Sequence, residues 1–243
     1  MIFAAGLGTR LKPWTDHHPK ALAVVNGKSL LQRNIEYLQS FGINEVVVNV
    51  HHFADQIEEA IYKNKGWGSN VVISDEREAV LETGGGLLKA RSHFYDQPVF
   101  LTMNADLLTN LNLHSIIAEH LASKCMVTLA VMTRESSRQL LFDRNNHLRG
   151  WRNKLTGVEK GEVAILDITE PLKEMAFSGI SVFSNDIFKL MPEEGKFSLT
   201  DFFLQLAPTC TIGGYNHTGD LFLDVGTQEK LEKAAIAISG IKH

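Results

Sequence analysis

Residues 2–20 constrain the fold of this chain more than any other segment. A short apolar run, residues 2–5, leads directly into Gly-Leu-Gly-Thr at residues 6–9 and then into Arg10. Glycine permits close approach of the backbone to a ligand, successive N–H groups form a nest that binds anions, and a guanidinium can hold phosphate oxygens in bidentate fashion. Lys20 supplies a second cation ten residues further on. The segment therefore predicts a polyphosphate site at the end of a strand.

Two better-known phosphate-binding glycine loops do not match this segment. The Walker loop requires Gly-x-x-x-x-Gly-Lys-Ser/Thr, and no such spacing occurs in residues 4–12. The dinucleotide fingerprint requires a third glycine, but Leu11 stands at that position. A dinucleotide-dependent oxidoreductase is therefore the least favoured enzyme class. The alternative without a binding function is a glycine-rich turn that carries basic residues by chance.

The composition is that of a globular chain without a nucleic-acid footprint. The 243 residues can bury a large core, and we expect a single α/β domain. The formal net charge of -4 argues against nonspecific binding to DNA or RNA. Cys125 and Cys210 are the only cysteines, which favours a reducing compartment over a disulfide framework. Because no apolar stretch approaches the roughly 20 residues that span a bilayer, we expect no membrane partner and a cytoplasmic location.

Hydrophobic patterns predict alternating helices and strands. The predicted helices cover residues 29–40, 55–64 and 113–123, and the predicted strands cover residues 45–50, 71–74, 98–103 and 125–132. Near-continuous β-branched runs are typical of buried parallel strands. We therefore expect a Rossmann-like α/β fold, with helices on both faces of a mixed, mainly parallel sheet. The first strand, residues 2–5, is short, so we expect further residues to precede Met1 in the native chain.

A second unusual loop follows the predicted strand 71–74. Residues 75–86 carry Glu76 and Glu82 and end in three consecutive glycines. We expect these glycines to open a short helix over residues 87–91 and to leave free N–H groups at its start. Together with the two carboxylates, such groups would offer the mixed donors and acceptors that read the edge of a purine or pyrimidine base.

An aspartate, Asp106, lies just past the predicted strand 98–103 and follows Asn104. Open α/β sheets bind ligands beyond the carboxyl ends of their strands. A carboxylate at this place can hold Mg²⁺ through one oxygen while the ion keeps its waters and phosphate ligands. The alternative is an aspartate that caps the following turn.

Five motifs, taken in chain order, resemble the signatures of the sugar-phosphate nucleotidyltransferases. They are AAGLGTR from Ala4 followed by Pro19-Lys20, LETGGG at residues 81–86, NAD at 104–106, FSGIS at 177–181 and DVGT at 224–227. The resemblance extends from Ala4 to about Leu231. Glu82 and Ala105 each replace a glycine of the usual motifs. LETGGG is most similar to the form found in N-acetylmuramate α-1-phosphate uridylyltransferases.

The resemblance implies the nucleotide-diphospho-sugar transferase fold and a division of roles along the chain. Residues 1–133 would bind the nucleotide, residues 134–220 would bind the sugar, and residues 221–243 would close the domain with a strand and a helix. The sugar-binding part contains short runs separated by turn residues, which are typical of strands. These runs are residues 139–142, 148–151, 163–168 and 176–183, and further helices are expected at 198–206 and 228–238.

The resemblance also assigns roles to single residues. Arg10 and Lys20 would be catalytic, and Asp106 and Asp224 would share one Mg²⁺ although 118 positions separate them. The nucleotide-binding residues would be Ala5, Gly6, Gly8, Thr9, Arg10, Glu76, Glu82, Thr83, Gly84 and Asn104. The sugar-binding residues would be Gln139, Glu159, Lys160, Ser178 and Gly179. For Glu159 and Lys160, an exposed hairpin is the favoured alternative. Gln139 stands where relatives often have Gly or Asp, which leaves the sugar open.

We therefore expect Mg²⁺-dependent transfer of a uridylyl group from UTP to a sugar 1-phosphate, with N-acetylmuramate α-1-phosphate as the favoured acceptor in peptidoglycan recycling. A guanylyl- or thymidylyltransferase acting on mannose or glucose 1-phosphate shares every catalytic motif. The alternative of another class is a regulatory subunit with the same fold. Such subunits tend to lose the arginine, lysine or aspartates, which are all present here. The sequence leaves the oligomeric state open.

Overall fold

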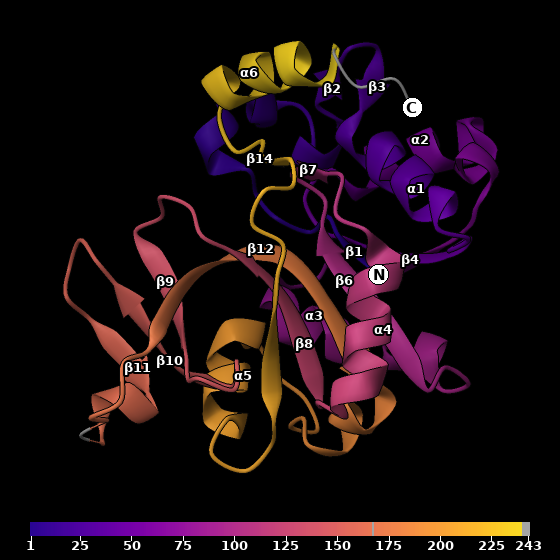
Figure 1. Ribbon diagram of the computed structural model, residues 1–243. Helices are drawn as coiled ribbons and strands as arrows, with labels where there is room; N and C mark the ends of the chain where they lie inside the picture. Colours follow the sequence, from indigo (N-terminus) through magenta and orange to yellow (C-terminus); the bar gives the residue numbers. More distant parts are fainter. Residues whose placement is uncertain (167, 240–243) are drawn as a thin grey trace. The chain divides into compact units, whose positions relative to one another are not determined.

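The structure, a computed structural model, describes residues 1–166 and 168–239. Two compact units make up this chain (Figure 1). Unit 1 consists of Met1–Glu82, Met103–Asn110 and the described residues from Leu221 onward, and unit 2 consists of Thr83–Thr102 and Leu111–Asp220. The glycine-rich segment and both strand-end aspartates belong to unit 1. The predicted nucleotide-binding part, residues 1–133, contributes to both units.

Four strands that contribute to unit 1 are parallel to one another. The short strand β1 (Ile2–Phe3) lies between β4 (Glu45–Val50) and the end of β6 (Val99–Asn104), and β5 (Asn70–Asp75) flanks β4. Their register places Phe3 opposite both Asn49 and Asn104, and the strands therefore end at one common edge. The predicted strand 45–50 is confirmed, and the segments that follow these strands emerge side by side.

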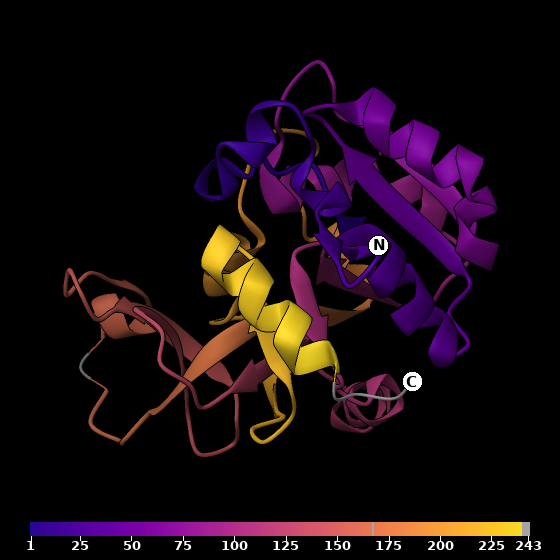
Figure 2. The same cartoon turned by 90° about the horizontal axis from the view of Figure 1, so that it is seen from above.

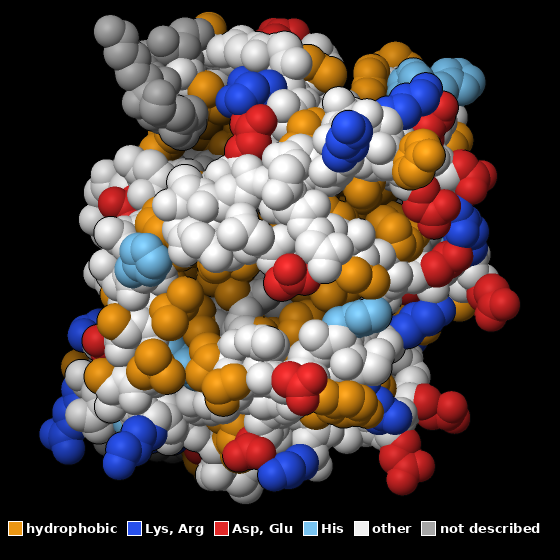
Figure 3. Space-filling model, turned by 90° about the vertical axis from the view of Figure 1, so that its right-hand side faces the viewer, with side chains coloured by type: hydrophobic (Ala, Val, Ile, Leu, Met, Phe, Trp, Pro, Cys, Tyr) orange, Lys and Arg blue, Asp and Glu red, His pale blue; other side chains and the backbone are white. Residues whose placement is uncertain are grey.

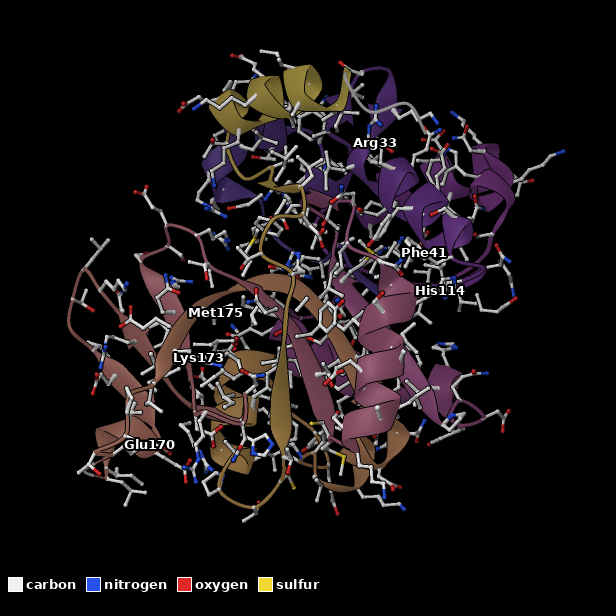
Figure 4. The ribbon with its side chains drawn as sticks, viewed as in Figure 1. Arg33, Phe41, His114, Glu170, Lys173 and Met175 are labelled. Atoms are coloured by element: carbon white, nitrogen blue, oxygen red, sulfur yellow. The ribbon has the colours of Figure 1, made fainter. Side chains whose placement is uncertain are left out.

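Helices α1 (Leu30–Ser40) and α2 (Ala54–Lys63) complete this part of unit 1. The side chain of Ser29 accepts a hydrogen bond from the N–H of Gln32 at 3.1 Å, which satisfies a free donor at the start of α1. Arg33, labelled in Figure 4, donates from Nε to the carbonyl oxygen of Val25 at 2.9 Å and anchors the preceding hairpin to α1. Helix α2 packs beside β5 (Figure 2).

A second layer of unit 1 supports the glycine-rich segment. Strand β7 (Leu107–Thr109) pairs antiparallel with β14 (Phe222–Asp224), and helix α6 (Gln228–Ser239) follows β14. A hairpin of β2 (Val24–Val25) and β3 (Lys28–Ser29) lies between the glycine-rich segment and α1 in the chain. One apolar cluster joins these elements, namely Leu11, Ala23, Val25, Leu30, Leu108, Val225 and Ala234. Burial of these side chains holds the loop that contains Arg10 and Lys20 against β7, β14 and α6.

Unit 2 is built around the long, curved strand β12 (Lys173–Ser184), which is orange in Figure 1. Strand β12 pairs antiparallel with both β8 (Val127–Met132) and β9 (Arg138–Phe142). The remaining strands are β10 (Leu148–Asn153), β11 (Glu159–Gly161) and β13 (Ile212–Asn216), and the helices are α3 (Glu82–Lys89, whose first residue belongs to unit 1), α4 (Leu113–Ser123) and α5 (Leu199–Leu206). Stacked phenylalanine rings, among them Phe100 and Phe183 at 5.0 Å between centroids, fill its core.

The predicted α/β class with a mixed sheet is confirmed, but two predicted elements are wrong. Helix α3 begins at Glu82, so the three glycines lie inside the helix and do not precede it. The reason is close packing, because a Cβ on Gly84 would lie 2.3 Å from the ring of Phe197. The run 163–168 is not a strand, since Glu162–Ala164 forms a 3-10 turn and residue 167 lies outside the described part. Strands β7 and β13 were not predicted.

The surface agrees with the weak net charge of the sequence. Acidic and basic side chains are interspersed on the face shown in Figure 3, and no large basic patch appears there. Within residues 1–166 and 168–239, no helix is both long enough and apolar enough to pass through a bilayer.

Candidate active site

Gly8 shapes the glycine-rich segment. It adopts a left-handed conformation with φ of 63° and precedes a 3-10 turn, Thr9–Leu11. A Cβ at this position would lie 3.0 Å from both Lys20 Cβ and Thr15 Cγ2. Thr15 also donates its hydroxyl hydrogen to the carbonyl oxygen of Gly8 at 3.0 Å. Glycine is therefore required here for its backbone conformation and for the close approach of the loop to Lys20.

Lys20 lies against the end of β6. Its ammonium forms an ion pair with the carboxylate of Asp106, and the side chain of Lys20 is only 13% exposed. The low exposure weakens solvent screening of this pair. Lys20 and Asp106, which the sequence predicts separately as site residues, are thus brought together.

The backbones of Asp106 and Asp224 lie close together. The N–H of Val225 donates to the carbonyl oxygen of Asp106 at 2.8 Å, and Asp224 stands opposite Leu107 in the β14–β7 pair. The pairing of these two short strands therefore brings together two aspartates from distant parts of the sequence. Lys230 on α6 donates to Asp224 Oδ2 at 2.7 Å, and no sequence motif had marked this lysine.

Arg10 completes a cluster of charged side chains. A Cβ added to Gly226 would lie 3.0 Å from both Arg10 Nη2 and Asp224 Oδ1, so the guanidinium and the carboxylate flank the same glycine. Arg10, Lys20, Asp106, Asp224 and Lys230 are together called the strand-end cluster below.

The strand-end cluster controls the ionisation of Asp224. Burial raises its pKa, but the hydrogen bond and charge of Lys230 and the charges of Lys20 and Arg10 outweigh burial. The net effect is a pKa below the ordinary value for aspartate. The carboxylate of Asp224 is therefore ionised at neutral pH.

The carboxylates of Asp106 and Asp224 suit a magnesium ion whose remaining ligands are water and phosphate. In the part of the chain that the structure describes, no group of three or more His, Cys, Asp or Glu side chains could enclose a metal. Lys20 is ion-paired with Asp106 and its charge acts on Asp224, so both carboxylates lie near this ammonium. Mg²⁺ in nucleotide enzymes usually takes one or two carboxylates and completes its shell with water and phosphate. Such an ion would be held by these two residues, and its presence stays a prediction.

The loop after β5 is anchored inside unit 1. Glu76 is only 1% exposed. Its Oε1 accepts a hydrogen bond from Asn49 Nδ2 at 2.7 Å, and its backbone oxygen lies 2.7 Å from His51 Nδ1, which donates in the tautomer that this contact requires. Glu82 begins α3 with a φ of 60° and is exposed. The start of the predicted base-binding loop is therefore rigidly held.

The N–H groups of the glycine run are not free. Gly84 and Gly85 both donate to the carbonyl oxygen of Phe197, at 2.8 Å and 3.4 Å. Thr83 Oγ1 accepts from the N–H of Leu199 at 3.0 Å. The expectation that this run offers free donors for a base is wrong, because the start of α3 is bound to the segment before α5 within unit 2.

Three predicted sugar-binding residues lie in the interior of unit 2. Gln139 is 3% exposed and donates from Nε2 to the carbonyl oxygen of Ser136 at 3.0 Å. Gly179 has a φ of 74° within an irregularity of the β12–β8 register, which interrupts the strand pairing. Ser178 Oγ lies 2.7 Å from His217 Nε2, and burial lowers the pKa of His217, so this histidine is neutral at pH 7. Their role toward a sugar stays a prediction.

Glu159 and Lys160 lie on the β10–β11 hairpin, as the alternative interpretation expected. Glu159 accepts from Arg152 at 2.6 Å, and Lys160 donates to Asp201 at 2.7 Å. Both side chains are thus engaged in ion pairs within unit 2, and a sugar phosphate would have to displace these partners.

The chain matches known proteins over almost its whole length. A family model described as nucleotidyl transferase matches residues 1–239. An N-acetylmuramate alpha-1-phosphate uridylyltransferase of Caulobacter vibrioides is 42% identical over 122 residues, which cover 49% of this chain and 47% of that protein. A protein of the same name from Neisseria meningitidis serogroup B is 30% identical over 96% of this chain and 95% of its own length. The crystal structure of HddC from Yersinia pseudotuberculosis has a TM-score of 0.77 at 25% identity, over 98% of this chain and 97% of that one.

Proposed function

The chain belongs to the nucleotidyl transferase family, and we propose that it joins UTP to N-acetylmuramate α-1-phosphate to form a UDP-sugar and pyrophosphate. The convergence of Arg10, Lys20, Asp106 and Asp224 in the strand-end cluster carries this proposal. The LETGGG motif at residues 81–86 and the similarity to the Neisseria protein support the choice of substrates.

The reaction needs no general base, because the attacking sugar phosphate is already an anion. One of its oxygens forms a bond to the α-phosphorus of UTP, and the bond from that phosphorus to the bridging oxygen of the β-phosphate breaks. The electron pair of the broken bond leaves with pyrophosphate. Since two anions must approach each other, catalysis depends on positioning and charge neutralisation.

Each cation of the cluster has a place in this scheme. Arg10 and the backbone N–H groups of residues 6–10 hold the leaving pyrophosphate. Lys20 exchanges Asp106 for the α-phosphate and the incoming sugar phosphate, and neutralises charge as they converge. Removal of a comparable charge-stabilising group costs about 3–4 kcal/mol in the transition state. Mg²⁺ held by Asp106 and Asp224 would neutralise phosphate oxygens and orient them.

We propose that the uracil base of UTP binds to the loop of residues 76–82 in unit 1. Uracil presents one N3–H donor between two carbonyl acceptors, a pattern that adenine does not share. A site whose buried polar groups match one base edge rejects a mismatched edge strongly, because those groups are left unpaired. The carboxylate of Glu76 is engaged with Asn49, so backbone groups of the loop are proposed as the main readers.

Cellular context follows from the same proposal. The two cysteines, Cys125 and Cys210, are both free thiols, as a reducing compartment requires. We place the reaction in the cytoplasm, in the reuse of sugars released from peptidoglycan.

A panel of nucleoside triphosphates against sugar 1-phosphates tests the function, with pyrophosphate release as the readout and Asp106→Asn as the inactive control. UTP with N-acetylmuramate α-1-phosphate is expected to give the highest kcat/KM, and ATP hardly any turnover. Comparable turnover with GTP would overturn the uridylyl assignment and leave nucleotidyl transfer intact. No pyrophosphate from any pair would favour a regulatory subunit with the same fold.

A further inference from the structure

Asn49 is a buried polar side chain near the carboxyl end of β4, an otherwise largely apolar parallel strand. It is 2% exposed, and β4 otherwise supplies buried valines at this depth. In register it lies between Phe3 on β1 and Ser74 on β5. A buried amide costs stability unless its donors and acceptor are satisfied. Its partners therefore indicate why an asparagine stands here.

Both ends of the Asn49 amide are used, and they bind different loops. Oδ1 accepts the N–H of Ala4 at 2.7 Å, and Nδ2 donates to Glu76 Oε1 at 2.7 Å. The orientation of the amide is fixed, since a flipped amide would face an N–H with an NH₂ group and a carboxylate with a carbonyl oxygen. The side chain thus connects the first residue after β1 with the first residue after β5.

The two partners begin the two parts of the proposed nucleotide site. Ala4 opens the segment that leads to Gly8 and Arg10, and Glu76 opens the loop assigned to the base. Glu76 is also held by His51 through its backbone oxygen and approaches the N–H of Leu81 at 3.5 Å through Oε2. A shift of the Glu76 carboxylate would therefore be passed to the loop as far as Leu81.

We propose that Asn49 is a positioning residue that sets the spacing between the phosphate-binding segment and the base-binding loop, and through this spacing contributes to the selection of the nucleotide. The inference rests on the proposed function of these two loops. Asn49 acts through Ala4 and Glu76 and does not touch the substrate. Its loss is expected to weaken the binding of the correct nucleotide much more than the chemical step.

Exchanging the donor and the acceptor of the hydrogen bond between Asn49 and Glu76 tests this role. Asn49→Asp keeps an oxygen for Ala4 but places a second carboxylate against Glu76, so the loop is pushed away. Glu76→Gln alone keeps the bond, because the new amide oxygen can still accept from Asn49. In the double variant Asn49→Asp/Glu76→Gln, the new amide of residue 76 donates to the new carboxylate of residue 49, and the contact is restored with the opposite polarity.

Steady-state kinetics give the first readout. Asn49→Asp is expected to raise the KM for UTP by about 10-fold to 100-fold and to lower the UTP-to-GTP ratio of kcat/KM, with kcat changed much less. The double variant is expected to recover most of both quantities. Gln39→Glu is the control, since Gln39 is a half-buried amide of unit 1 that donates to Trp67 O and Ser69 Oγ, away from the strand ends. It should lower stability and leave the KM for UTP unchanged.

Amide hydrogen exchange gives a readout that does not depend on turnover. Peptides covering residues 76–81 should exchange faster in Asn49→Asp and recover protection in the double variant. The inference is overturned if Asn49→Asp keeps the wild-type KM and exchange, or if the folded double variant remains as impaired as the single one. Wild-type protein that turns over no nucleotide would instead count against the proposed function, while the exchange experiment would still decide whether Asn49 positions the loop.

Discussion

Lys20 is ion-paired with Asp106, 86 residues further along the chain, at the edge where the parallel strands of unit 1 end. Asp224, which is joined to Asp106 through the β14–β7 pairing, is in turn paired with Lys230. Each of the two proposed magnesium ligands thus has a lysine as counter-ion in the free protein. Binding of Mg²⁺ and phosphates must therefore release ammonium groups from these carboxylates, and the released Lys20 is placed to meet the phosphates.

Lys20→Met should lower kcat by about 10²-fold to 10³-fold and change nucleotide affinity much less, because the cation neutralises charge that develops only as the phosphates converge. Lys12→Met is the matched control, since Lys12 is an exposed lysine of the same loop that pairs with Asp16. Stopped-flow pyrophosphate release and nucleotide titration separate the two effects. Equal losses in affinity and in kcat/KM would make Lys20 a simple binding residue.

Lys230→Met should strengthen the binding of Mg²⁺ to the substrate-free protein by about two-fold to five-fold, the range that exposed ion pairs support. The reason is that the competing ammonium at Asp224 is removed. Titration calorimetry measures the affinity directly and without turnover. Lys233→Met, on the same helix but paired with Glu229, is the control. Unchanged or weaker binding in Lys230→Met would show that the lysine does not compete with the ion.

Gly226→Ala should lower kcat/KM by about 10-fold, because its Cβ would lie 3.0 Å from both Arg10 and Asp224 and would force one of them to move. The melting temperature should change little, since the displaced atoms belong to the ends of side chains. Parallel thermal melts and kinetics test this expectation. Wild-type activity in a normally folded variant would mean that the Arg10–Asp224 spacing does not matter for catalysis.

Asp143→Asn should destabilise the protein by about 2 kcal/mol at pH 7, because it removes a charged partner of Arg149 in the interior of unit 2. Burial raises the pKa of Asp143, but hydrogen bonds from His147, Arg149 and Asn145 outweigh it, and the net pKa is below the ordinary value of 3.8. The contribution of this carboxylate is therefore complete above pH 3.8 and is lost as the pH falls through its lowered pKa.

Urea unfolding at several pH values checks this prediction. The difference between wild type and Asp143→Asn should shrink below pH 3.8. Asp186→Asn serves as control, because Asp186 is an exposed partner of Lys189. A difference that stays constant down to the lowest pH would show that the charge of Asp143 does not stabilise the fold.

The parallel strands and the charged residues at their ends could be predicted from the sequence for a clear physical reason. Buried β-branched runs such as residues 45–50 leave a strong local pattern, and parallel strands bring the residues that follow them to one edge. That rule alone predicts Asp106 as a site residue. The resemblance of DVGT to a family motif added Asp224, which the pairing of two three-residue strands then brings next to it.

The residues that sequence reasoning missed act through tertiary contacts without a local pattern. Asn49 and Lys230 are single polar residues whose importance comes from distant partners, namely Ala4, Glu76 and Asp224. The prediction of free N–H groups at residues 84–86 was wrong because consecutive glycines are typical both of open loops and of close packing. Here the ring of Phe197, more than a hundred residues further along the chain, packs against Gly84.

Anomalous diffraction from crystals grown with Mn²⁺ and UTP tests the central claim most directly, since Mn²⁺ accepts the oxygen ligands that suit Mg²⁺. One Mn²⁺ is predicted between the carboxylates of Asp106 and Asp224, in contact with a phosphate of the nucleotide, with Lys20 moved from Asp106 toward the α-phosphate. A Mn²⁺ ion bound away from either carboxylate, or a nucleotide whose phosphates lie away from Arg10 and Lys20, would contradict the account.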